Sequence, residues 1–455
     1  MAEIIIKELD EKRFNALAGF SRSPASAYVS KELAWYSNED ETILGVLLLD
    51  IIDDDFASVI LGKDEGGRFR AFDFQVSFPD VDSALNWLHN TIKWHTCNSP
   101  KIFPQGDASQ PLDLFTPIVP VERQHIYFTH LISSSMFTPA REIIKNIMPS
   151  YIDVDGNFIE QFQSSGFDSR LWELCLYAYL TEEQLFIERE HITPDFLVKK
   201  YGKTVAIEAV IVGRKLDNLP QYFKISTKLK TPNEVLIEHE NAMPIRFGSS
   251  LYSKLQKKYW ELPHVNGNPL VFAIADFHDD QSMLWSSTAL INYLYGFKHD
   301  FYYDETGKLI IEPKKIETHR VGGKEVLSGF FFQPMTEHIS AVLFSASGTI
   351  SKFNRIGRQA GFKDPNVLMI RMGLCHDHDP NAAFPKMFKY IVDEKSKETW
   401  GEGFSMFHNP NALYPVPEGL FPSIGHHHFK EGLIVSTLPE FHPYASFTYN
   451  LRSKK

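Results

Sequence analysis

The chain has 455 residues, of which 43% are hydrophobic and 23% charged, and its formal net charge is -11. This composition excludes a largely disordered chain, and the length predicts two or three folded domains. The negative balance argues against a general nucleic-acid coat, because phosphate binding requires local positive charge. Cys97, Cys175 and Cys375 show no CxxC spacing, and no long apolar run is present. We therefore expect a cytoplasmic protein with no disulfide framework and no membrane partner.

Residues 1–95 are expected to form an N-terminal α/β module. The stretch SPASAYVSKELAWYS, residues 23–37, has helical periodicity, with Ser23 as N-cap and Pro24 at the first helical position. The apolar runs that follow it predict strands. Five prolines between residues 100 and 120 preclude one regular element, so we place a linker at 96–120. The module is a candidate surface for a protein partner.

Residues 121–327 show a defined order of predicted elements. A helix at 167–183 precedes three strand-like runs, QLFIEREHI, PDFLVKK and TVAIEAVIV, and these precede a helix at 249–262 and a strand at 268–277. The short connection YGK between the last two runs predicts a hairpin. Residues 328–455 are strand-rich, and the pattern leaves open whether their strands join this sheet or form a third unit.

Three carboxylates lie in this part of the chain. Asp195 follows a proline at the start of one strand-like run, Glu208 lies in the next run, and Glu173 lies in the preceding helix. Phosphodiester hydrolysis needs a hard cation, and two carboxylates on neighbouring strands can hold one Mg²⁺ if they share a sheet face. The alternative is a structural ion pair with Lys or Arg. The apolar surroundings of Glu208 favour the metal, because a buried carboxylate without compensation is costly.

This order of elements, with Asp on the second strand and Glu on the third, resembles the PD-(D/E)xK nuclease superfamily over residues 167 to 277. The resemblance implies an α/β protein with a restriction-endonuclease-like αβββαβ core, flanked by the N-terminal module and strand-rich C-terminal additions. It further implies a nuclease dependent on Mg²⁺ (or Mn²⁺), acting on DNA rather than RNA. Glu173, Asp195, Glu208 and the backbone carbonyl of Ala209 would surround the metal. Defence against foreign DNA is a setting in keeping with this class.

The motif departs from the superfamily pattern at Val210, where a lysine is expected. Some members of the superfamily supply this group from the following helix. In the helix predicted at 249–262, Lys254 and Lys258 lie one turn apart beside the apolar stripe, so either could point towards the metal. Two alternatives remain open. The lysines could simply cover apolar surface with their stems, or the chain could be an inactive nucleic-acid-binding or scaffold protein.

Positive charge gathers around the candidate site. Residues 196–260 contain 12 Lys and Arg against 5 Asp and Glu, a balance of +7 in a chain of net charge -11. We expect this segment to line a groove for phosphates, although a solvated lysine-rich loop has the same composition. The candidate nucleic-acid-binding residues are Lys199, Lys200, Arg214, Lys215, Lys228 and Lys230.

A second metal motif competes with the first. In CHDHDPN, residues 375–381, His376 and His378 would share one face of a strand and could bind Zn²⁺, as in a zinc hydrolase. The Pro-Asn pair that follows is instead typical of a polar turn. The run GHHHF, residues 425–429, is interpreted as a surface loop. The sequence leaves the oligomeric state open.

Overall fold

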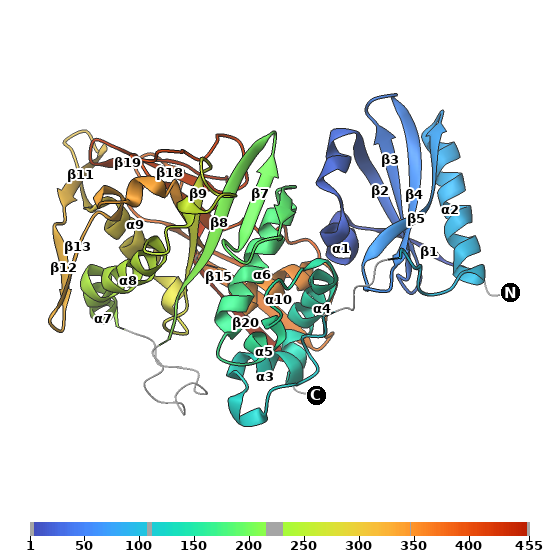
Figure 1. Ribbon diagram of the computed structural model, residues 1–455, viewed down its shortest axis with the longest axis horizontal. Coiled ribbons are helices and arrows are strands. Elements are labelled where there is room, and N and C mark those ends of the chain that lie inside the picture. Colours follow the sequence, from blue (N-terminus) through green and yellow to red (C-terminus); the bar gives the residue numbers. More distant parts are fainter. Residues whose placement is uncertain (1–3, 107–111, 215–230, 346, 453–455) are drawn as a thin grey trace.

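The computed structural model describes residues 4–106, 112–214, 231–345 and 347–452 (Figure 1). Over these residues the protein is a mixed α/β structure built on a five-stranded and an eight-stranded sheet, with smaller sheets beside them. The five-stranded sheet and its helices lie to one side of the rest of the chain in Figure 1. None of the helices in the described ranges combines the length and apolar character that a bilayer crossing requires.

The N-terminal sheet is antiparallel, and strands that are consecutive in sequence are neighbours in it. Leu44 and Val46 face the helix α1, whereas Ile43 and Leu47 face α2, as the two-residue period of a strand requires. The sheet therefore has a helix on each face. Its elements are β1 (Ile6–Leu9), α1 (Glu11–Ala18), β2 (Ser30–Asn38), β3 (Ile43–Asp50), β4 (Asp55–Lys63), β5 (Phe69–Phe78) and α2 (Val81–Asn98).

The helix predicted at 23–37 is wrong. Ser23 does cap a short 3₁₀ helix, Pro24–Tyr28, by accepting a hydrogen bond from the backbone nitrogen of Ala25 at 3.3 Å. The chain then enters β2, which pairs with β1 on one side and β3 on the other. Two ladders of backbone hydrogen bonds, and aromatic residues suited to a pleated surface, outweigh the local helical pattern.

The central sheet joins strands from two distant parts of the sequence. Its order is β19-β18-β17-β14-β9-β8-β7-β6, in which β8, β9 and β14 run parallel at the centre. Strands from beyond residue 328 thus extend the sheet that carries the candidate site. These strands are β6 (Phe186–Glu188), β7 (Phe196–Lys200), β8 (Lys203–Val212), β9 (Leu270–Asp276), β14 (Ala341–Ser345), β17 (Phe404–His408), β18 (Gly425–Lys430) and β19 (Leu433–Thr437).

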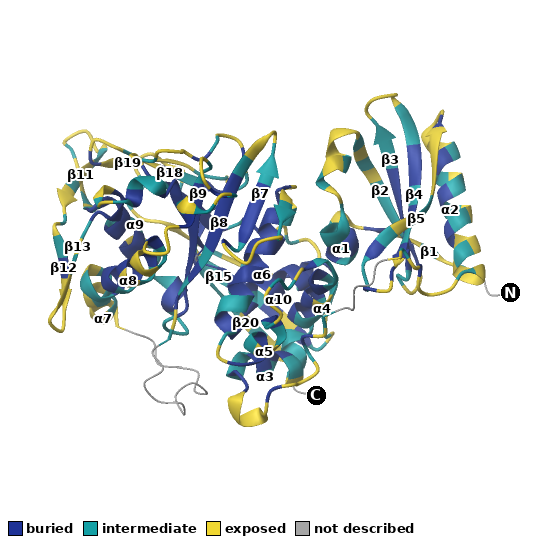
Figure 2. Ribbon diagram, in the orientation of Figure 1, coloured by how far each residue is buried: buried dark blue, intermediate teal, exposed yellow. Residues whose placement is uncertain are grey.

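Helices cover both faces of this sheet, and β9 at its centre is buried at every position (Figure 2). On one face, Trp172 of α6 donates a hydrogen bond from Nε1 to the carbonyl of Ala273 at 2.9 Å. The other face packs against α8 and α9, and Gly296 ends α9 in the left-handed conformation, which glycine adopts readily. The helices are α3 (Ile126–Ser133), α4 (Thr138–Ile147), α5 (Phe158–Gln163), α6 (Phe167–Glu182), α7 (Pro232–Ile237), α8 (Met243–Leu255), α9 (Ser287–Tyr295) and α10 (Ile350–Gln359).

The remaining strands form small antiparallel sheets at the periphery. One has three strands in the order β16-β15-β20. Two others are hairpins, β10-β11 and β12-β13. The strands beyond residue 328 are therefore divided. Some of them join the central sheet, and others form a separate sheet, so both arrangements that the sequence left open occur. The strands are β10 (Phe297–Tyr303), β11 (Leu309–Lys315), β12 (Thr318–Val321), β13 (Lys324–Leu327), β15 (Val367–Cys375), β16 (Lys386–Ile391) and β20 (Pro443–Arg452).

Candidate functional site

The strands β7 and β8 form the predicted hairpin and bring Asp195 beside Glu208. Phe196 pairs with Ile207 in this ladder. Asp195 directly precedes Phe196 and Glu208 directly follows Ile207, so the two carboxylates occupy the next position of the same register. Oδ2 of Asp195 accepts a hydrogen bond from the backbone nitrogen of Ala209 at 2.7 Å, which fixes the carboxylate against β8.

Glu208 points to the face of the sheet that α8 covers. Its neighbours two residues away on β8, Ala206 and Val210, both pack in the core on that face. Glu208 is 3% exposed, and Oε1 accepts hydrogen bonds from Lys254 Nζ at 2.5 Å and from the Tyr259 hydroxyl at 2.7 Å. Oε2 is buried and has no hydrogen-bond partner. An unsatisfied carboxylate oxygen in such a place is costly unless a cation or a proton meets it.

The electrostatics of Asp195 reflect this crowding. Burial raises the pKa of the Asp195 carboxyl to about 8, and the negative charges of Glu208 and Glu173 act in the same direction. The hydrogen bond from Ala209 and the charge of Lys254 oppose that shift. Two carboxylates this close in a poorly solvated place cannot both ionise without cost. A divalent cation at this position would remove the repulsion, so the pair fits an oxygen-liganded metal.

Glu173 lies on α6 and has other partners. It accepts hydrogen bonds from the Tyr151 hydroxyl, from Arg170 Nη1 at 2.7 Å and from Arg189 Nη2 at 3.0 Å. Across the described ranges, no three His, Cys, Asp or Glu side chains converge closely enough to hold a metal ion. The structure therefore unites Asp195 with Glu208 but does not add Glu173 to them as a third ligand.

Of the two candidate lysines, Lys254 lies on the following helix and contacts Glu208, whereas the predicted helical position of Lys258 is wrong. The helix α8 begins at Met243 and ends at Leu255, earlier than the predicted end at 262. Lys258 lies beyond it with a left-handed backbone, φ 51°, and its Nζ is 3.4 Å from Glu261 Oε1. The two lysines therefore do not share one helix flank, because the chain has left the helix before the second. Of these two lysines, Lys254 is the one that contacts Glu208, and its side chain is 31% exposed.

Arg214 is part of an internal network, and its contact with phosphate stays a prediction. Its Nη1 is 2.7 Å from Asp280 Oδ1, and its Nε is 3.4 Å from Asp168 Oδ2. The Tyr127 hydroxyl donates to the same oxygen of Asp280 at 2.7 Å. These two carboxylates raise the pKa of the Arg214 guanidinium above its ordinary value, against the effect of burial. The network ties the end of β8 to the elements around it.

The other predicted phosphate contacts divide into two groups. Lys199 Nζ lies 2.6 Å from Glu188 Oε1 across the β6-β7 ladder, and Lys200 Nζ donates to the carbonyl of Glu183 at 2.6 Å. Both ammonium groups thus have protein partners at the edge of the sheet, and their binding to phosphate stays a prediction. The other three candidates lie outside the described residues: Lys215, Lys228 and Lys230.

Tyr259 is a site residue that sequence reasoning missed. Tyr259 is buried, and nothing in the neighbouring sequence marks its hydroxyl as the partner of Glu208. Burial and the negative charge of Glu208 raise the pKa of the Tyr259 hydroxyl above its ordinary value, so it remains a donor. Sequence reasoning also missed the contact of Arg189 with Glu173, because these two residues lie sixteen positions apart in sequence.

The histidine motifs are arranged differently from their predictions. His376 and His378 follow the end of β15 rather than sharing a strand face. Nδ1 of His376 lies 2.8 Å from the Tyr444 hydroxyl, and Nε2 of His378 lies 2.9 Å from the carbonyl of Glu440. No third metal-binding side chain joins them within the part of the chain that is described. The run at 425–429 belongs to β18 rather than to a surface loop, and His427 in it is buried.

Comparison of the chain with protein-family models, with characterised proteins and with solved structures found no match.

Proposed function

We propose that this protein is a metal-dependent nuclease that hydrolyses phosphodiester bonds of DNA in the cytoplasm, on a restriction-endonuclease-like core formed by α6, β6, β7, β8, α8 and β9. The observation that supports this proposal is the contact between Lys254 and Glu208 beside Asp195. It joins two strand carboxylates to a lysine that comes from the next helix instead of from position 210. A purely structural ion pair gains nothing from a second buried carboxylate beside it, because the two negative charges repel each other.

The residues that would hold Mg²⁺ or Mn²⁺ are Asp195, Glu208 and the backbone carbonyl of Ala209. They fit the ion on two counts, the buried Oε2 of Glu208 without a partner and the unfavourable proximity of two carboxylates. A bound divalent ion would supply charge neutralisation at the scissile phosphate and a more acidic water. Such ions keep several waters and need few protein ligands, so two carboxylates suffice.

The side chains of the protein then have distinct roles. Lys254 has three N–H donors and uses one on Glu208, which leaves two for an attacking water or a phosphate oxygen. Its ammonium would stabilise negative charge that develops in the transition state. Tyr259 holds Glu208 by a hydrogen bond to Oε1, and the backbone nitrogen of Ala209 holds Asp195. These contacts keep both carboxylates in one orientation before substrate arrives.

A second candidate function is a catalytically inactive protein that binds nucleic acid or serves as a scaffold. The same ion pair favours it, because Lys254 already neutralises Glu208 without any metal. A zinc hydrolase at His376 and His378 gains no such support, since both imidazoles have protein partners there.

Cleavage of supercoiled plasmid, linear duplex and single-stranded substrates, with Mg²⁺, Mn²⁺ or EDTA, tests the proposal. We expect cleavage by the wild type with either ion, none in EDTA and none by Asp195→Ala. Titration calorimetry should show Mn²⁺ binding by the wild type only. Metal binding without cleavage of any substrate would favour the inactive protein, and neither binding nor cleavage would refute the metal site.

A further inference from the structure

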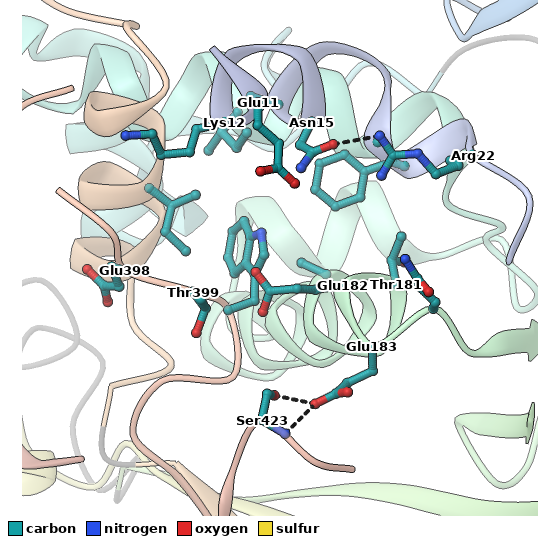
Figure 3. A pocket seen from close by; sticks show the side chains of 18 of the residues that line it. Glu11, Lys12, Asn15, Arg22, Thr181, Glu182, Glu183, Glu398, Thr399 and Ser423 are labelled. Atoms are coloured by element: carbon teal, nitrogen blue, oxygen red, sulfur yellow. Dashed lines mark hydrogen bonds between the residues drawn. The ribbon is translucent and has the colours of Figure 1, made fainter. Parts of the chain in front are cut away.

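A cavity of about 600 Å³ is lined in part by residues at the C-terminal end of α6. Figure 3 shows it between α1 of the N-terminal unit, the C-terminal end of α6, and the chain before Trp400. Small-molecule sites commonly have volumes of about 300 to 1,000 Å³ and occur where structural units meet. This cavity has both properties, because its walls come from the N-terminal sheet unit and from the helices of the central sheet.

Part of the cavity wall is apolar. The apolar side chains of this wall come from several elements: Phe20 after α1, Ile143 of α4, Ala178 of α6, Ile356 of α10, and Trp400. Such a surface can cover the hydrocarbon part of a small molecule. A ligand that consisted of charge alone would leave these walls in contact with water.

Most of the charged groups in the wall already have partners. Arg22 Nε lies 2.7 Å from Glu32 Oε1, and Lys12 Nζ donates to the carbonyl of Ser396 at 3.1 Å. Glu183 accepts hydrogen bonds from the backbone nitrogen and the hydroxyl of Ser423. Glu398 pairs with Arg355 of α10 at 2.6 Å. Arg22 and Lys12 are thus held by these contacts, and the third cation of the wall, Lys397, is exposed and forms no ion pair with a carboxylate of the wall among the described residues.

Two carboxylates, Glu11 and Glu182, have no cation within ion-pair distance among the described residues, and both side chains face the cavity in Figure 3. Glu182 Oε2 accepts a hydrogen bond from the backbone nitrogen of Gly401 at 3.0 Å. Desolvation by the surrounding protein raises the pKa of the Glu182 carboxyl to about 7, against the effect of backbone hydrogen bonds from Trp400 and Gly401, and the residue is exposed on the wall of the cavity. A carboxylate so placed gains most from a positively charged partner that enters from the cavity.

We propose that this cavity binds a small organic cation, a protonated amine carried on an apolar body, with the ammonium group on Glu182 and Glu11. Charge decides the class of ligand. An anion would meet Glu11 and Glu182 and could pair only with the exposed Lys397 among the cations of the wall, and a neutral apolar molecule would leave Glu182 without a counter-charge. The proposal does not depend on nuclease activity, because none of these residues belongs to the candidate nuclease site.

The test uses the full chain and three probes of nearly equal shape: 2-phenylethylamine, 2-phenylethanol and 3-phenylpropanoate. We expect titration calorimetry at pH 8, where Glu182 is ionised, to show the amine binding and the other two binding at least tenfold more weakly. Glu182→Gln should weaken the amine about tenfold or more, the effect of a hydrogen bond to a charged group. Glu122→Gln, an exposed position outside the cavity, is the matched control and should bind as the wild type does.

Two results would overturn the proposal. One is wild-type protein that binds the amine no better than the alcohol, or that binds no amine in the millimolar range. The other is a folded Glu182→Gln variant with wild-type affinity for the amine. The comparison of probes on the wild type keeps the test decisive even if the variant does not fold.

Discussion

Lys254→Ala should remove most of the nuclease activity while leaving metal and DNA binding nearly intact. In the structure its Nζ lies 2.5 Å from Glu208 Oε1 and its side chain is 31% exposed, so it can reach a bound phosphate. A preorganised donor that acts on developing charge is commonly worth about 10²- to 10³-fold in rate, or about 2.7 to 4 kcal/mol of activation free energy. We expect a loss in that range, because the role is confined to the transition state.

The substitution also affects stability. It leaves Glu208, which is 3% exposed, without its cation but still bonded to Tyr259. Loss of the cationic partner of a buried charge costs about 3 to 5 kcal/mol when no other group meets the charge, and the remaining bond from Tyr259 and proton uptake by the carboxylate should keep the cost below that range. The folded variant should therefore remain available for assay.

The assay is single-turnover cleavage of a duplex with Mg²⁺, accompanied by binding of the same duplex in Ca²⁺. Lys258→Ala is the matched control, since this lysine lies four residues further on and pairs with the exposed Glu261. It should cleave at nearly the wild-type rate. Wild-type cleavage by folded Lys254→Ala would refute the assignment of this lysine, and an equal loss in both variants would show that only the general positive charge matters.

The remaining predictions concern the site and the fold. Asp195→Asn should abolish cleavage. It should also abolish the stabilisation by Mg²⁺, which in the wild type should be about 2.7 kcal/mol at a hundredfold excess over Kd and visible as a higher melting temperature. In EDTA, calorimetry should find the variant at least as stable as the wild type, because one of two neighbouring carboxylates is gone. Arg214→Ala should lower the free energy of unfolding in urea by about 3 kcal/mol, because it removes the cation that pairs with Asp168 and Asp280, and a change below 1 kcal/mol would contradict the internal role. Burial lowers the pKa of His427 from 6.5 to about 3, so the folded state binds its proton less readily than the unfolded chain. The contribution of His427 to stability should thus be full above about pH 6.5 and decline by about 1.4 kcal/mol per pH unit down to about pH 3. His427→Asn should lessen the measured slope by about that amount in urea titrations at successive pH values, while the slopes due to His125, His408 and His442 remain.

Local sequence was sufficient for features that depend on neighbouring residues. The order of helix, three strands, helix and strand follows from hydrophobic periodicity, and the hairpin follows from the short connection at Tyr201 and Gly202. The end of α9 at Gly296 follows from the freedom of glycine to adopt positive φ. The neighbouring positions of Asp195 and Glu208 belong to the same group, because a tight hairpin fixes its own register.

Tertiary structure decided everything that depends on partners distant in sequence. Residues 30–38 form a strand because strands on both sides offer backbone hydrogen bonds, although their local pattern is helical. Lys254, and not Lys258, meets Glu208 because α8 ends at Leu255, and Tyr259 joins them across fifty-one positions of sequence. Periodicity shows which face of an element is buried, but the atom that meets a buried carboxylate is set by how the elements pack, and that was decided only in the folded chain.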